Sequence, residues 1–270
     1  MQLNFRRQGQ NQGENQGTSN NPAVVLIHGL LGSLENLNSV AKALANQFDV
    51  ISIDLPNHGS SPHCDEVSYQ QMASDIGQLM DNLDIEKYTL LGHSMGGKVA
   101  MQLAIDSPER IDKLIVVDVA PVAYSAKHQD IFTALAAIKL DQLTNRKAAE
   151  LALQPLIPEI GIRQFLLKSL VKQDEKFVWR FNLHGLINNY GNISQGIKGN
   201  GSFLGQTLFI KGGNSDYLSS EHRDTILSYF PNSKARIISD AGHWVHAEKP
   251  ELFNRLVNDF LQPKRQNNQD

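Results

Sequence analysis

Short, unbroken runs of apolar residues alternate along this chain with segments whose apolar residues recur every three or four positions. The first pattern is typical of a strand buried on both faces, and the second is typical of an amphipathic helix. The predicted strands cover residues 23–27, 50–53, 89–91, 114–119, 207–210 and 235–238. Strands that alternate with helices predict an α/β fold, built on a mostly parallel, doubly wound sheet with helices on both faces.

One long region breaks this alternation. From about residue 123 to 202 the pattern is helical and contains no convincing strand. The helical stretches are 132–143, 146–153, 161–171 and 176–186. A separate helical domain is the alternative, but both flanking parts are needed to complete the sheet. We therefore predict a core formed by residues 1–122 and 203–270, with residues 123–202 inserted as a helical cap.

Polar residues dominate both ends of the chain. Residues 8–21 contain no apolar side chain, so we interpret them as a flexible polar stretch, and the tail 264–270 is expected to fray. The first ten residues lack the apolar core of a signal peptide, and no apolar run approaches the ~20 residues of a membrane-spanning helix. We therefore expect a cytoplasmic protein without membrane contact.

Composition narrows the function further. The chain has 270 residues, of which 41% are hydrophobic, so a sizeable core is expected. Its formal net charge of −3 argues against a nucleic-acid partner, because such proteins present a strongly basic face. The one cysteine, Cys64, excludes an internal disulfide and is interpreted as a passive loop residue. A small-molecule partner remains, and the oligomeric state stays open.

A Gly-x-Ser-x-Gly motif at residues 92–96 carries the strongest chemical signal. It follows a predicted strand and precedes a predicted helix, which is the setting of a nucleophile elbow. In such an elbow Ser94 is the nucleophile, and the Met95 N–H points at a developing oxyanion. A tight Gly-Ser turn without chemistry is the alternative reading of the bare motif.

Serine needs a base, and His243 is the best of the nine histidines. It follows the last predicted strand, and in a doubly wound sheet such loops gather at the same edge as Ser94. His246 is nearer the last helix, so we assign it a structural role. The acid that orients the imidazole comes from Asp118 or Asp216, each of which follows a predicted strand. The residues alone leave these two candidates near parity.

Two further loops follow predicted strands. The His28-Gly29 turn places the Leu30 N–H as a second oxyanion donor beside that of Met95. His28 itself is interpreted as a structural hydrogen-bonding residue. In the turn-rich loop 54–61 we assign structural roles to Asp54 and His58.

The cap is expected to set substrate specificity. Its large apolar residues are candidates either for the cleft or for packing within the cap: Phe132, Leu135, Phe165, Leu166, Leu170, Trp179 and Phe181. Of these, Phe132, Phe165 and Trp179 are our candidate substrate-binding residues. Nearby cations at 168, 172 and 180 are interpreted as solvated charges, with a phosphate-bearing leaving group as the alternative. Lys98, one turn into the elbow helix, is expected to pair with a local carboxylate.

Together, the motifs HGLLGS, DLPNHGSS, GHSMGG and GHWVHAEKP resemble the α/β-hydrolase superfamily over residues 22–261. The segments GHSMGGK, VDVAPVAY, WRFN and GGNS look like the bacterial YbfF-type esterases, to which hydrolysis of acyl esters and of thioesters such as acyl-CoA is ascribed. That family carries its acid in a V/I-D-I/V-A-P motif, so the resemblance favours Asp118. Where many α/β-hydrolases have Asp in a Gly-x-x-Asp pattern, this chain has Ser215, and Asp216 comes one residue late.

These observations predict a serine esterase or thioesterase that acts through a Ser-His-Asp triad and an acyl-enzyme. No metal or organic cofactor is implied. Two alternatives remain: a C–C bond hydrolase on the same scaffold, and a non-catalytic small-molecule receptor.

Overall fold

A computed structural model describes residues 1–9 and 21–262 of the chain. The predicted stretch 8–21 and the tail 264–270 therefore lie largely outside the described residues. Gln8 belongs to a strand, which corrects the boundary predicted for the polar stretch.

A seven-stranded sheet forms the centre of the molecule, with the strand order β1-β3-β2-β4-β5-β8-β9. All neighbouring pairs are parallel except β1, which runs antiparallel to β3. The strands are β1 (Phe5–Gln8), β2 (Ala23–Ile27), β3 (Asp49–Ile53), β4 (Tyr88–His93), β5 (Ile111–Val117), β8 (Gln206–Gly212) and β9 (Ser233–Ile238). The predicted mostly parallel sheet is confirmed, and β1 is the strand that the apolar pattern missed.

Side chains of β2 show why the central strands read as unbroken apolar runs. Val25 and Ile27 belong to one buried cluster, whereas Val24 and Leu26 belong to a second cluster on the other face. Successive strand residues point to opposite faces, so a strand covered on both sides must be apolar throughout.

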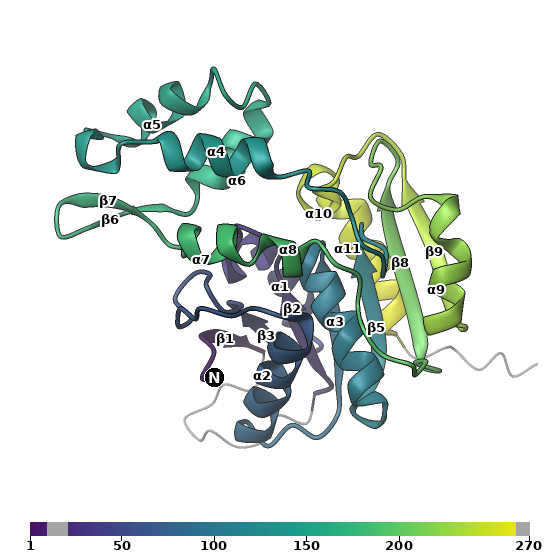
Figure 1. Cartoon of the computed structure of the whole chain (residues 1–270). Coiled ribbons are helices and arrows are strands. Elements are labelled where there is room, and N and C mark those ends of the chain that lie inside the picture. Colours follow the sequence, from purple (N-terminus) through teal and green to yellow (C-terminus); the bar gives the residue numbers. More distant parts are fainter. Residues whose placement is uncertain (10–20, 263–270) are drawn as a thin grey trace, which may run out of the picture.

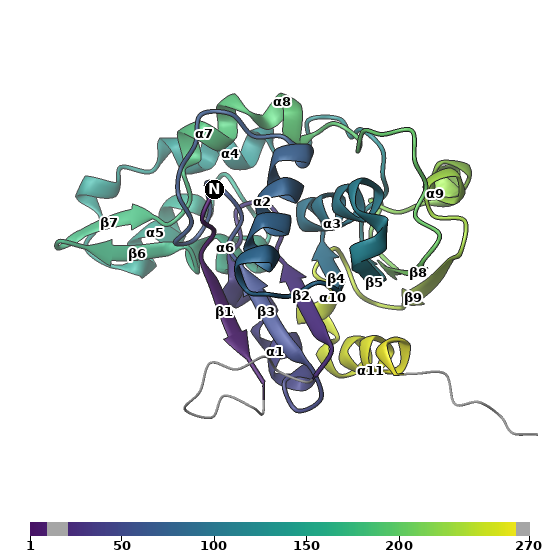
Figure 2. The same cartoon turned by 90° about the horizontal axis from the view of Figure 1, so that it is seen from below.

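Helices cover both faces of this sheet (Figures 1 and 2). The first cluster includes residues of α2 and α3, and the second includes residues of α1 and α11. The helices of the core are α1 (Asn38–Leu44), α2 (Tyr69–Asn82), α3 (Met95–Asp106), α9 (Arg223–Tyr229), α10 (Val245–Glu248) and α11 (Pro250–Leu261). Within the first cluster, α3 packs against β4, the strand that directly precedes it.

The segment between β5 and β8 lies over one end of the sheet (Figure 1). Its elements are α4 (Gln129–Ala137), α5 (Arg146–Leu153), α6 (Ile160–Leu167), β6 (Leu170–Gln173), β7 (Lys176–Trp179), α7 (Leu183–Asn188) and α8 (Tyr190–Ile193). The expectation of a segment without strands was wrong, because β6 and β7 form an antiparallel hairpin. Residues 176–179, which we expected to be helical, form its second strand.

Polar contacts join this segment to the core. The Asn182 N–H donates to the Asn57 carbonyl at 2.9 Å, and the Asn189 side chain accepts from the Val67 N–H at 2.9 Å. The Ser169 hydroxyl also donates to the Leu31 carbonyl at 3.2 Å. The cap is therefore held against the loops that follow β2 and β3.

Candidate active site

Ser94 lies at the sharp turn between β4 and α3, with φ 54° and ψ −120°. Such a backbone conformation is strained for a residue with a side chain, and it is maintained by the elements packed around it. A Cβ on Gly96 would lie 2.3 Å from the His28 carbonyl oxygen, and a Cβ on Gly92 would lie 2.2 Å from that of Gly96. Glycine at these two positions therefore allows β2, β4 and α3 to approach closely enough to hold the turn.

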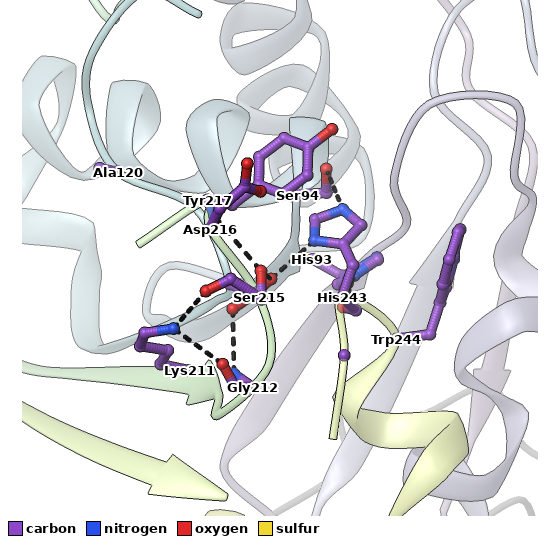
Figure 3. Close-up of polar contacts among 12 residues, drawn as sticks. His93, Ser94, Ala120, Lys211, Gly212, Ser215, Asp216, Tyr217, His243 and Trp244 are labelled. Atoms are coloured by element: carbon purple, nitrogen blue, oxygen red, sulfur yellow. Dashed lines mark hydrogen bonds and ion pairs between the residues drawn. The ribbon is translucent and has the colours of Figure 1, made fainter. Parts of the chain in front are cut away.

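Three of the predicted residues form a continuous chain of hydrogen bonds (Figure 3). His243 Nε2 lies 3.0 Å from Ser94 Oγ, and His243 Nδ1 lies 2.7 Å from Asp118 Oδ2. A carboxylate can only accept, so Nδ1 carries the proton and Nε2 is free to accept from the serine hydroxyl. This is the arrangement in which a histidine acts as a base toward serine.

Asp118 is fully buried directly after β5, with φ 54°. Its carboxylate accepts from the Gly212 N–H at 3.0 Å and from the Ser215 hydroxyl, in addition to His243. Asp216 lies apart from this chain, because its side chain is 77% exposed and pairs with Lys127 Nζ at 2.6 Å. The structure thus places Asp118, not Asp216, against the imidazole.

His243 is held on three sides. The Tyr217 ring stacks on it with centroids 4.1 Å apart, and the Trp244 ring meets it edge-on at 5.5 Å. His93 Nε2 donates to the His243 carbonyl at 2.9 Å. Burial, followed by the neighbouring His246, lowers the pKa of His93 well below its ordinary value. His93 is therefore a neutral donor that fixes the backbone of His243.

The two predicted oxyanion donors come from two different loops, Leu30 from the loop after β2 and Met95 from the turn after β4. Met95 is the first residue of α3, so its N–H has no acceptor within the helix. The Leu30 N–H has no hydrogen-bond partner in the described part of the chain, and both residues line a cavity together with Ser94. The next amide, that of Leu31, donates to His58 Nε2 at 3.1 Å and anchors this loop.

The residues to which we assigned structural roles make buried hydrogen bonds away from Ser94. His28 Nε2 accepts from the Leu55 N–H at 3.1 Å, and Asp54 accepts from the N–H groups of Leu34 and Ser60. Burial lowers the pKa of His58 to about 3, so this ring stays neutral as an acceptor for the Leu31 N–H. His246 is 3% exposed, and its ring packs edge-on against that of His93.

Two cavities meet at Ser94. The larger chamber has a volume of about 300 Å³ and is lined by Gly29, Leu30, Leu31, His93, Ser94, Lys127, His128, Ile131, Ile162, Phe165, Leu166, Tyr217, His243 and Trp244. Phe165, one of the predicted binding residues, lines it and packs against Trp244 at 5.5 Å. Phe132 and Trp179 are not among its lining residues: Phe132 packs on Tyr190, and Trp179 stacks on Phe181.

The smaller chamber has a volume of about 40 Å³ and shares Leu30, Ser94, Lys127, His128 and Tyr217 with the larger one. It is lined by Leu30, Tyr69, Ser94, Met95, Lys98, Val119, Tyr124, Ser125, Lys127, His128, Tyr190, Ile193, Ser194 and Tyr217. We expected Lys98 to pair with a local carboxylate, and for the described residues this prediction was wrong. Its Nζ donates instead to the Gln195 carbonyl at 2.5 Å and lies 4.6 Å from the centre of the Tyr124 ring.

The remaining charged candidates of the cap lie outside both chambers. Lys172 forms an exposed ion pair with Glu175, Arg180 Nη1 lies 3.4 Å from Glu35, and Lys168 is exposed. Cys64 is half-buried, and burial is the main cause that raises the pKa of its thiol. A raised thiol pKa disfavours the reactive thiolate, as a passive loop residue requires.

Sequence reasoning missed three residues of the site. Ser215 binds Asp118, Tyr217 stacks on His243, and His128 lines both chambers. His128 Nδ1 lies 2.7 Å from the Tyr190 hydroxyl, and burial lowers the His128 pKa to about 4. Ser215 stands where many α/β-hydrolases carry their acid, and that departure was the one signal that could have revealed its contact with Asp118.

Metal ligation and membrane insertion find no support in residues 1–9 and 21–262. This part of the chain contains no group of three or more His, Cys, Asp or Glu side chains arranged to hold a metal ion. No helix within it is both long and apolar enough to cross a membrane.

Comparison with known proteins identifies the family. The model of the alpha/beta hydrolase fold matches residues 22–250. Esterase YbfF of Escherichia coli is 41% identical over 263 residues, which cover 97% of this chain and 99% of the relative. The sn-1-specific diacylglycerol lipase ABHD11 of the mouse is 39% identical over 91% of this chain and 82% of its own length.

A solved marine microorganism esterase superposes with a TM-score of 0.91 at 35% identity, covering 96% of this chain and 99% of that structure. The chain therefore belongs to the alpha/beta hydrolase fold family, and its predicted resemblance to the YbfF-type esterases is confirmed. The names of these relatives support an ester hydrolase.

Proposed function

We propose that the protein is a serine hydrolase of carboxylic esters, with Ser94 as nucleophile, His243 as base and Asp118 as the acid that orients the imidazole. The observation that carries this proposal is the chain of hydrogen bonds from Asp118 through His243 to Ser94, which lies beside a chamber of about 300 Å³. The relatives named esterases or lipases support the same reaction class.

The residues act in two half-reactions. Ser94 Oγ attacks the ester carbonyl while its proton passes to His243 Nε2, and the Leu30 and Met95 amides bind the oxyanion. The tetrahedral intermediate collapses as the imidazolium protonates the departing oxygen, which leaves an acyl group on Ser94. His243 then takes a proton from water, the resulting hydroxide attacks the acyl carbonyl, and the acid leaves as Ser94 regains its proton.

The cap, residues 123–202, selects the substrate in this proposal. The cap contributes Ile131, Ile162, Phe165 and Leu166 to the lining of the larger chamber. These apolar side chains favour an apolar group next to the ester. A thioester such as an acyl-CoA would react by the same steps, with sulfur in place of the departing oxygen. No cofactor takes part in any step.

The test is hydrolysis of p-nitrophenyl esters of graded acyl length, together with acyl-CoA thioesters, by wild-type protein and by Ser94→Ala. We expect turnover in the wild type and its loss by at least ~10³-fold in Ser94→Ala, because the covalent step is removed. Turnover that survives this substitution would contradict the proposal. Absence of turnover by folded wild-type protein would instead favour a C–C hydrolase, tested with a vinylogous diketone, or a receptor that is stabilised by ligand without forming product.

A further inference from the structure

Lys98 is a buried cation that the proposed reaction leaves without a role. It is 2% exposed on α3, one helical turn after Ser94. Its ammonium donates to the Gln195 carbonyl and lies over the rings of Tyr124 and Tyr69, at 4.6 and 5.6 Å from their centres. The described residues offer its other N–H donors no acceptor and no carboxylate. An uncompensated charge in this position costs stability, and burial lowers the pKa of Lys98 to about 7.

The two chambers differ in which catalytic groups they contact. His243 lines the larger chamber and is not among the residues that line the smaller one. In the proposed reaction His243 protonates the departing oxygen, so the alcohol part of an ester must lie in the larger chamber. The acyl part then extends past Met95 into the smaller chamber, where Lys98 lies.

The smaller chamber limits both the size and the chemistry of that acyl part. Since one water needs about 10–15 Å³ on the same measure, a volume of about 40 Å³ holds about three or four non-hydrogen atoms. The hydroxyl groups of Tyr69 and Tyr124 already donate to the carbonyls of Ile193 and Tyr217. Lys127 also lines the chamber, but it pairs with Asp216. Lys98 is thus the cation with donors left to offer.

We propose that the smaller chamber is a subsite for a short acyl group that ends in a carboxylate, which the Lys98 ammonium binds. The preferred substrate is then a half-ester of a short dicarboxylic acid with an apolar alcohol. This inference rests on the proposed ester hydrolysis and adds the chemical class of its acyl group. A bound carboxylate would supply the acceptors that Lys98 lacks, and charge-assisted hydrogen bonds are among the strong ones.

The experiment compares two esters of the same shape. Monobutyl malonate carries a carboxylate where butyl 3-methylbutanoate carries an isopropyl group, and both release butanol, which gas chromatography measures. Each acyl group extends four non-hydrogen atoms beyond the carbonyl carbon, which is about what the smaller chamber holds. We expect wild-type protein to favour the half-ester in kcat/KM by about 10- to 100-fold, the range that a charge-assisted hydrogen bond supplies. We expect Lys98→Met to abolish or reverse that preference.

The control is Lys113→Met. Lys113 Nζ also donates to backbone carbonyls, those of Phe260 and Leu261 at 2.9 Å, but it lines neither chamber. We expect this variant to keep the wild-type preference. A wild type that favours the neutral ester overturns the subsite whether or not Lys98→Met folds, and so does a preference that survives in folded Lys98→Met.

Failure of the subsite is distinguishable from failure of the proposed function. Hydrolysis of p-nitrophenyl esters that depends on Ser94, without a preference for the half-ester, overturns the subsite alone. Wild-type protein that hydrolyses neither the p-nitrophenyl esters nor the two butyl esters overturns both.

Discussion

The Ser215 hydroxyl donates to Asp118 Oδ2, the same oxygen that accepts from His243 Nδ1. Ser215 comes from the loop after β8, whereas Asp118 follows β5, and these two strands are parallel neighbours whose carboxyl ends lie at the same edge of the sheet. The Ser215 hydroxyl also accepts from the Tyr217 N–H at 3.3 Å. Many members of the superfamily carry their acid at the position of Ser215. In this chain Ser215 instead supports Asp118, the acid that follows the neighbouring strand β5.

This relationship predicts that the acid can be moved between the two strands. Asp118→Ser should lower kcat by about 10⁴-fold, because His243 loses the carboxylate that sets its tautomer. The double variant Asp118→Ser with Ser215→Asp should recover at least tenfold of that loss. The reason is that the side chain at position 215 already lies within hydrogen-bonding distance of the Asp118 carboxylate. The measurement is kcat on a p-nitrophenyl ester.

Asp216→Asn is the control for this exchange. Its side chain is exposed and pairs with Lys127 on the surface, so we expect kcat within about twofold of wild type. A large loss in Asp216→Asn, with activity retained in Asp118→Ser, would show that the acid is Asp216. An exchange variant no better than Asp118→Ser would show that the loop after β8 cannot deliver a carboxylate.

His93 is predicted to act through its hydrogen bond to the His243 carbonyl. His93→Leu should lower kcat about tenfold or more with little change in KM, because the imidazole loses the support that keeps it in line with Ser94. His93→Gln should recover most of the activity, since its side-chain N–H can reach the same carbonyl. Steady-state kinetics of the two variants decide between hydrogen bonding and packing: equal losses would exclude the hydrogen bond as the cause. His184→Leu, at an exposed position, is the control.

Stability should fall on mild acidification, because buried histidines are neutral in the folded protein. Burial lowers the pKa values of His58 and His246 from 6.5 to about 3. Between these values the unfolded chain binds more protons than the folded one. Each such histidine therefore contributes stability that is complete above pH 6.5 and is lost toward pH 3, by about 1.4 kcal/mol per pH unit.

Urea unfolding between pH 7.5 and pH 5.0 measures this dependence. His58→Gln should make the fall in unfolding free energy shallower, because one of the buried titrating groups is gone and an amide oxygen can still accept from the Leu31 N–H. His63→Gln, at an exposed position, is the matched variant. An unfolding free energy that does not change over this range would contradict the neutral state of the buried rings.

The elbow should tolerate no side chain at position 96. Gly96→Ala puts a Cβ 2.3 Å from the His28 carbonyl oxygen and 2.4 Å from that of Ile27, and both atoms belong to the backbone. Because β2 cannot yield as a flexible side chain would, we expect a loss of about 3 kcal/mol or more in unfolding free energy.

Gly161→Ala is the comparison for this loss. Its Cβ meets nothing within 4 Å, and the residue lies in α6, where alanine is a better helix former by about 1 kcal/mol. We expect unchanged or slightly higher stability. Equal unfolding free energies for Gly96→Ala and Gly161→Ala would contradict the prediction, because they would show that α3 can move away from β2 at no cost in stability.

The sequence alone predicted the features that depend on local pattern. The run at 23–27 is β2 residue for residue, because a strand covered on both faces has no polar positions. The elbow at Ser94 was equally visible, because its glycines and the flanking strand and helix lie within a few residues. The loops of Leu30 and His243 were placed by one topological rule, that the carboxyl ends of parallel strands share an edge.

What the sequence left open depended on contacts between distant segments. The choice between Asp118 and Asp216 stayed near parity until the fold showed which carboxylate meets His243, 125 residues from Asp118. The β6–β7 hairpin was missed because its turn is Asp174-Glu175, with φ 46° and 64°, where such turns favour asparagine and glycine. Lys98 read as an ordinary helix charge, and its burial among Tyr69, Tyr124 and Gln195 exists only because the cap closes over α3. Local pattern fixes secondary structure and turns, whereas which polar group faces which is decided by packing between segments far apart in the chain.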